Sequence, residues 1–140
     1  MSFIASLWDL CEGSHPYPER CDDEDEEGTR NTREIRITDL TLPGAFVVRY
    51  PGSLAHPDPV FGYGYFCLHA NPLHITVYFF EPLIDGSGDM YHYVGQVTHH
   101  DESDPSDPET TIQGKRQRLR PDGTRDITAD EEWTSNRPVA

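Results

Sequence analysis

From residue 33 onward, apolar and polar residues alternate in short stretches that are separated by turn-forming residues. Ile35 and Ile37, for example, alternate with Arg36 and Thr38, a period of two that is typical of a strand with one buried face. Pro43-Gly44, the run 85–88 and Pro121-Asp122-Gly123 are turn signals. We therefore predict a strand beginning at residue 33 and further strands over 45–50, 60–69, 73–81, 90–98, 110–120 and 124–128.

The first eleven residues follow a different period. Phe3, Ile4, Leu7, Trp8 and Cys11 have the spacing of one face of a helix. The stretch is too short to be a stable helix in water on its own. The pattern predicts a short N-terminal helix that docks on its own core or on a partner.

Together these elements predict an all-β fold. Six to seven short antiparallel strands, mostly in a meander, would form a small barrel or sandwich, because a single twisted sheet leaves both edges exposed. We divide the chain into an amphipathic segment with an acidic linker (1–32), a β domain (33–128) and a polar tail (129–140). The acidic linker and the stretch 99–109 are expected to be acidic loops.

Composition narrows the class of protein. The chain has 140 residues, enough for one domain, with 25 acidic and 11 basic side chains and a formal net charge of −14. That charge argues against direct binding to nucleic acid, because phosphate would be repelled. Neither an apolar run long enough for a transmembrane helix nor a typical signal peptide is present, so we expect a cytoplasmic protein, or one built into an assembly made there.

The three cysteines do not indicate a disulfide framework, because their number is odd. Cys67 lies in an apolar run and is expected to be a small buried residue, whereas Cys11 and Cys21 are expected to be exposed thiols. Neither a Gly-x-Ser-x-Gly elbow nor a catalytic cysteine signature is present, so an enzyme is the less favoured class.

Histidines offer one candidate metal site. His69 and His74 flank a predicted turn and His92 lies on the next strand, so three imidazoles at a barrel mouth could bind a transition metal such as zinc. The usual spacings of zinc ligands are absent. Our primary expectation is that the protein has no cofactor, and the metal is the alternative.

A basic stretch near the C-terminus offers a candidate anion site. On a strand, Arg116, Arg118 and Arg120 share one face, which suits an anion or an inter-subunit contact. Alternatively, they form a charged edge strand that is neutralised by acidic segments of the chain.

Tyrosines have two interpretations. Tyr63, Tyr65, Tyr91 and Tyr93 could line a ligand cavity or a protein interface, since tyrosine combines apolar area with a hydrogen-bonding tip. Packing within the sheet is the simpler interpretation for most aromatic residues in this part of the chain.

We predict a non-enzymatic interaction module that binds a basic or mixed protein surface, such as an inhibitor, an immunity-type protein or a small subunit of a larger assembly (a virion, for example). The apolar segment would anchor the partner and the acidic run would attract it. Homo-oligomers are also possible partners, whereas a membrane is not expected. The alternative is a small barrel that binds a small molecule. The predicted partner-binding residues are Phe3, Ile4, Leu7, Trp8, Asp22, Asp23, Glu24, Asp25, Glu26 and Glu27.

Overall fold

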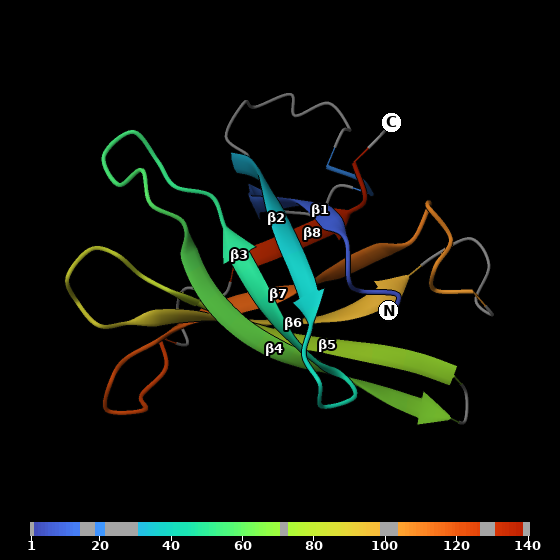
Figure 1. Ribbon diagram of the computed structural model, residues 1–140. Helices are drawn as coiled ribbons and strands as arrows, with labels where there is room; N and C mark the ends of the chain where they lie inside the picture. The colour runs from blue at the N-terminus through green and yellow to red at the C-terminus, as the bar shows by residue number, and fades with distance from the viewer. Residues whose placement is uncertain are drawn as a thin grey trace.

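The chain folds into a closed barrel of eight antiparallel strands (Figure 1). The computed structural model describes residues 2–14, 19–21, 31–70, 73–98, 104–126 and 131–138. Each strand pairs with its neighbours in the sequence, and the last strand pairs with the first, so the barrel is a closed meander. The strands are β1 (Leu7–Ser14), β2 (Asn31–Asp39), β3 (Ala45–Tyr50), β4 (Val60–Ala70), β5 (Leu73–Pro82), β6 (Met90–Thr98), β7 (Thr111–Leu119) and β8 (Glu131–Asn136).

The prediction of an all-β fold is confirmed, with a barrel rather than a sandwich, whereas the number of strands and the N-terminal helix were wrong. Strands β2 to β7 lie where the alternating pattern places them. In place of the strand predicted over 124–128, the described residues to 126 form a turn with one bridge between Leu119 and Arg125. The eighth strand lies in the predicted polar tail. Within the described ranges there is no helix, and so none that could span a membrane.

The predicted N-terminal helix is replaced by strand β1. Pairing with both β2 and β8 gives this segment two ladders of backbone hydrogen bonds, which a ten-residue helix could not match. Ile4 and Trp8 are fully buried in the chain's own core, and the Trp8 indole Nε1 donates a 2.8 Å hydrogen bond to the carbonyl of Ile4. Phe3 packs edge-on against Phe66, with ring centroids 5.1 Å apart. The apolar segment therefore docks on its own barrel.

Large side chains fill the interior of the barrel. Trp8 and Trp133 are both completely buried. The indole ring of Trp133 fits because it lies against Gly95 of β6, where a Cβ atom would approach the ring to 2.6 Å. The remaining fully buried core consists of large side chains from most of the strands: Leu10, Ile35, Phe46, Val48, Tyr50, Val77, Phe79, Tyr93 and Ile112.

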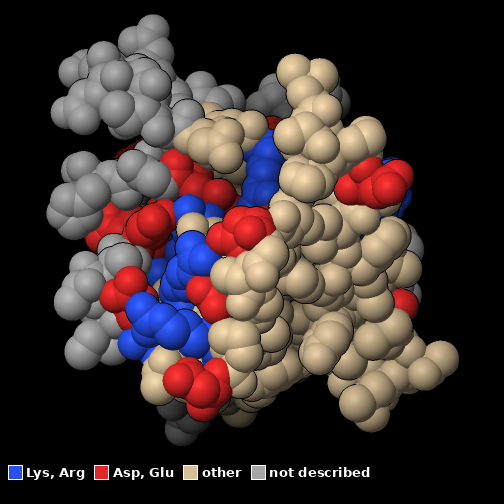
Figure 2. All heavy atoms as spheres, turned by 90° about the vertical axis from the view of Figure 1, so that its left-hand side faces the viewer, with Lys and Arg blue, Asp and Glu red and all other residues tan. Residues whose placement is uncertain are grey.

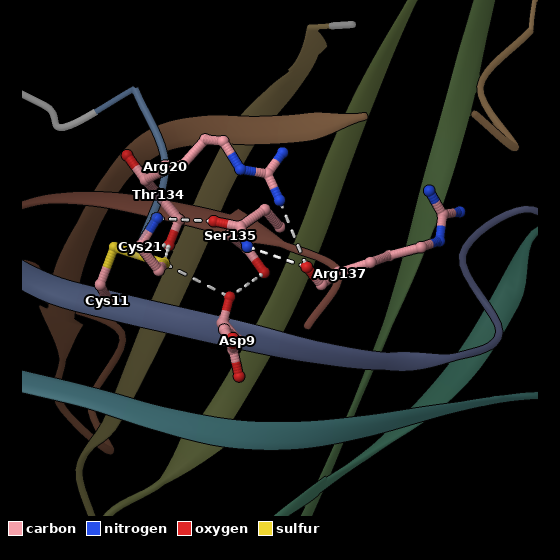
Figure 3. Close-up of a disulfide and its surroundings, with 8 residues drawn as sticks. Asp9, Cys11, Arg20, Cys21, Thr134, Ser135 and Arg137 are labelled. Atoms are coloured by element: carbon pink, nitrogen blue, oxygen red, sulfur yellow. Dashed lines mark hydrogen bonds between the residues drawn. A yellow bond between two sulfur atoms is a disulfide. The ribbon is translucent and has the colours of Figure 1, made fainter. Parts of the chain in front are cut away.

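A disulfide ties residues 19–21 to the outside of the barrel (Figure 3). Cys11 and Cys21 are bonded, with 5.5 Å between their Cα atoms, a usual separation for a disulfide. The backbone N–H of Cys21 donates a 2.6 Å hydrogen bond to Oδ1 of Asn136 on β8. The prediction that these two cysteines are exposed thiols was therefore wrong. Cys67 is the free cysteine of the described residues, and it is half-buried rather than part of the core.

Candidate functional site

One end of the barrel interior is lined by charged side chains, and we call it the charged end. Its residues are Glu12, Arg33, Glu81, Tyr93, Arg116 and Glu131, which come from β1, β2, β5, β6, β7 and β8. Figure 2 looks onto the left-hand side of the molecule in Figure 1, where arginines and carboxylates gather beside a broad uncharged area. Charge is thus concentrated at one end of a barrel whose core is otherwise apolar.

The Tyr93 hydroxyl is the centre of the charged end. It lies 2.6 Å from Oε1 of Glu12 and 2.9 Å from Oε1 of Glu81. Arg116 and Arg33 donate to its oxygen from 3.0 Å and 3.2 Å. Two carboxylates and two guanidinium groups therefore surround one buried hydroxyl.

The two arginines also bind these carboxylates directly. Arg33 makes a two-pronged contact with Glu81 and a 2.9 Å contact with Oε1 of Glu12. Arg116 donates to Oε2 of Glu12 over 2.9 Å and makes a two-pronged contact with Glu131. Each buried charge has a partner of opposite sign, which compensates for much of its desolvation.

Burial sets the protonation states in this network. Burial first, and then the carboxylates of Glu12 and Glu81, raise the pKa of Tyr93 well above 10.0. Burial alone would lower the pKa of Arg33, but its hydrogen bond to Glu81 and the charge of Glu12 outweigh that effect and raise it. The hydroxyl therefore stays neutral and the guanidinium stays charged. The charged end is a compensated polar core in which each charge is paired, although the Nε of Arg33 is buried without a hydrogen-bond partner among the described residues.

The arginines predicted as an anion site are paired within the chain. Arg116 belongs to the charged end. Arg118 contacts Asp89 over 2.6 Å and Asp85 over 2.9 Å. Arg120 lies 3.9 Å from Asp126. The alternative interpretation, internal pairing with acidic segments, describes these contacts, but β7 is not an edge strand because β6 and β8 flank it.

A second feature lies outside the barrel and is uncharged; we call it the aromatic face. The strand registers place five outward positions on each of β4, β5 and β6 side by side. None of these positions holds Lys, Arg, Asp or Glu, although the chain carries 25 acidic and 11 basic residues. They are Phe61, Tyr63, Tyr65, Cys67 and His69 on β4, His74, Thr76, Tyr78, Phe80 and Pro82 on β5, and Met90, His92, Val94, Gln96 and Thr98 on β6.

Several of these rings are well exposed yet packed on one another. Phe61 is 57% exposed and Tyr63 is 69% exposed. Tyr65 and Tyr78 stack at 4.8 Å between centroids with a 19° interplanar angle, and Phe80 and His92 stack at 4.5 Å and 6°. Since stacked neighbours cover each other's ring faces, this surface presents mainly ring edges and hydroxyl tips to the outside.

Basic side chains flank the aromatic face. On one side, Arg49 of β3 is paired in register with Phe61, and on the other, Lys115 of β7 is paired with Val94. Arg125 lies 2.8 Å from Nδ1 of His92. The first charged side chains on both flanking strands are thus positive, in a molecule that is strongly negative overall.

The three histidines predicted to share a metal are not brought together. His69 and His74 stack at 4.3 Å at the tip of the β4–β5 hairpin. His92 is opposite Phe80, six residues along β5 from His74, which is roughly 20 Å at the usual strand rise. No group of three or more metal-ligating side chains occurs among the described residues. One ion cannot bridge this set, because the register separates it.

The predicted partner-binding residues have different positions. Ile4 and Trp8 are buried in the core, so they cannot anchor another protein. Phe3 and Leu7 are half-buried, and Leu7 lies opposite Arg36 on the outer surface. The acidic run 22–27 lies outside the described residues.

Sequence reasoning proposed an interface role for some tyrosines but could not orient them. Tyr63 and Tyr65 are on the aromatic face, whereas Tyr93 points into the barrel and Tyr91 is half-buried beneath the guanidinium of Arg116, 3.9 Å away. The missed signal was charge: every odd position from Phe61 to His69, and every even position from His74 to Pro82, is uncharged.

Comparisons with models of protein families, with curated proteins and with solved structures each found no match for this chain.

Proposed function

We propose that this protein is a non-enzymatic interaction module that binds another protein through the aromatic face. The observation that carries the proposal is the uncharged surface over three neighbouring strands of a chain with a net charge of −14. Extended exposed apolar patches mark interaction sites, and the centres of protein interfaces are rich in aromatic and poor in charged residues.

The arrangement of the rings favours a protein over a nucleic acid or another flat ligand. A base binds by stacking on an open ring face, but Tyr65 with Tyr78, and Phe80 with His92, already cover each other's faces. The net negative charge would also repel phosphate. Ring edges and hydroxyl tips suit the mixed apolar and hydrogen-bonding contacts of a protein surface.

Side chains rather than backbone must make the contact. Every described strand has two neighbours in the closed barrel, so no edge is open for a partner strand. Inhibitors and small subunits of assemblies are often non-catalytic modules with one docking face. We therefore keep the interaction hypothesis and move its anchor from the N-terminal segment to the aromatic face.

Photo-crosslinking tests the proposal. A photoreactive phenylalanine derivative would be introduced in place of Tyr63 or Tyr78, and, as a matched control, in place of Thr32, an exposed residue of β2. In the cells that make the protein, irradiation should yield discrete adducts with another protein from the two face positions and not from residue 32.

A second variant guards against adventitious crosslinks. Phe80→Asp places one charge at the centre of the aromatic face and should abolish the adduct formed at Tyr63, because burying an unpaired carboxylate is costly. Circular dichroism would verify that this variant remains folded. Equal labelling at all three positions, or adducts that persist with Phe80→Asp, would refute the proposal.

A further inference from the structure

A row of four outward side chains crosses the barrel beside the aromatic face. The registers place Leu7 of β1 opposite Arg36 of β2, Arg36 opposite Arg49 of β3, and Arg49 opposite Phe61 of β4. Directly opposed side chains on neighbouring strands have Cβ atoms about 5 Å apart. Two exposed arginines therefore lie next to each other, with an apolar side chain at each end of the row. We call this the arginine row.

The two arginines are placed at a cost to stability. Like charges directly opposite each other in a sheet are destabilising. Within the described part of the chain, neither Arg36 nor Arg49 forms an ion pair, whereas Arg33, Arg116 and Arg118 all do. Glu34, two residues from Arg36 on the outer side of β2, forms no ion pair with either arginine in the described structure. Contacts among the described residues therefore do not account for this pair.

An outer groove adjoins the row. It has a volume of about 540 Å³ and is lined by residues 5–7 on one side and 36–39 on the other. Leu7 and Ala5 give it an apolar wall and Arg36 supplies a cation. The carboxylate of Asp39, also in this groove, is already occupied by the backbone N–H and hydroxyl of Ser2. The cation in the groove is thus left available for a ligand.

We propose that the arginine row receives an acidic segment of the protein that binds the aromatic face. Two neighbouring guanidinium groups bind a carboxylate strongly and with defined geometry. Leu7 and Phe61 would contact apolar side chains before and after the acid. The inference rests on the proposed function, since Phe61 belongs to both surfaces, and it adds the chemistry of the partner: apolar side chains interrupted by Asp or Glu.

A second copy of this chain fits less well. In a two-fold contact through this surface, the arginine rows of both copies would approach each other. Two molecules that each carry a charge of −14 would also repel over longer distances. Charge complementarity therefore selects a different chain, one that is acidic where it meets the row.

The test is selection from a random twelve-residue peptide library displayed on phage, with the intact oxidised protein as bait. Peptides that bind should be enriched in Asp and Glu next to apolar residues. The double substitution Arg36→Gln with Arg49→Gln should lower the affinity for the selected peptides by roughly tenfold or more at low salt. Raised salt should lower the affinity of the wild type as well. Arg120→Gln, the same change at an exposed arginine just after β7 that lies near Asp126, is the matched control and should have no effect.

Stability gives a readout that separates recognition from structure. Because the two arginines repel each other, the double Gln variant should be at least as resistant to urea as the wild type while it loses peptide binding. Peptides without acidic enrichment, or affinities that the double variant leaves unchanged, would overturn the inference. If Phe80→Asp abolishes binding of such peptides while the double Gln variant does not, the proposed function is supported and only the role of the arginine row is refuted. A dimer disrupted by Arg49→Gln would also overturn it in favour of self-association.

Discussion

At the scale of single residues, Tyr93 shows how this barrel tolerates charge inside it. Its ring stacks on Phe79 at 4.4 Å between centroids, so one side chain joins the apolar core to the charged end. Its hydroxyl oxygen accepts from two guanidinium groups while its proton is shared with two carboxylates. The same side chain therefore supplies packing and the last hydrogen bonds of the network.

Replacing Tyr93 by Phe keeps the packing and removes only the hydroxyl. The free energy of unfolding should fall by about 1–3 kcal/mol, because buried charged partners lose a hydrogen bond that water cannot replace. Urea unfolding monitored by fluorescence measures this. Tyr91→Phe is the control, since the Tyr91 hydroxyl makes no hydrogen bond to the described residues, and it should change stability by less than about 0.5 kcal/mol. Equal effects of the two substitutions would contradict the role given to the hydroxyl.

Two buried tyrosines also predict sensitivity to alkali. Burial, and then the charge of Glu81, raise the pKa of Tyr50 above 10.0, and the pKa of Tyr93 is raised in the same direction. A pKa that is higher in the folded state means that the stabilisation is complete below the ordinary value and is lost as the pH rises above it. Stability should fall above about pH 10, by up to about 1.4 kcal/mol per pH unit for each tyrosine.

Urea unfolding between pH 8 and pH 11.5 measures that slope. Tyr50→Phe and Tyr93→Phe should each make it shallower, whereas Tyr63→Phe, at an exposed position, should leave it unchanged. A slope that all three variants share with the wild type would show that neither buried hydroxyl titrates during unfolding.

At the scale of elements, β1 shows why local pattern failed at the N-terminus. The same stretch also places Trp8 and Leu10 on alternate positions that point inward. Local spacing could not decide between a helix and a strand, and pairing with β8, about 120 residues away, decided it. β8 was missed for the complementary reason: Trp133 is its single large apolar residue, so no alternation is visible.

The disulfide is the covalent part of this element. It encloses residues 12–20, and closing a loop of this size should stabilise the fold by about 3 kcal/mol. Cys11→Ser with Cys21→Ser should lower the free energy of unfolding by about that amount, measured in urea with Cys67→Ser as the control. Unfolded, unreduced protein should show one reactive thiol; three would contradict the bond.

At the scale of the whole molecule, the sequence predicted the all-β class of the fold, but it did not predict which strands close the barrel. The turn signals and the alternating stretches located β2 to β7, and edge exposure argued for a barrel or sandwich. Strands β1 and β8 complete the barrel, and they are the two that carried no strand pattern. The candidate surfaces were predicted less well. The inward or outward orientation of Tyr63 and Tyr93 depends on register, and Arg36 and Arg49 become neighbours only after β2 and β3 are aligned.

The alternation of inward and outward positions along β4, β5 and β6 separates two kinds of evolutionary constraint. Inward sites such as Gly64, where a Cβ atom would come within 2.1 Å of the Tyr78 carbonyl, leave no freedom for substitution. The outward sites between them can accept new residues without disturbing the inward packing that holds the barrel together. A lineage carrying this chain could thus exchange one binding specificity for another while its folding stays intact, and a laboratory library restricted to those outward codons would use the same freedom.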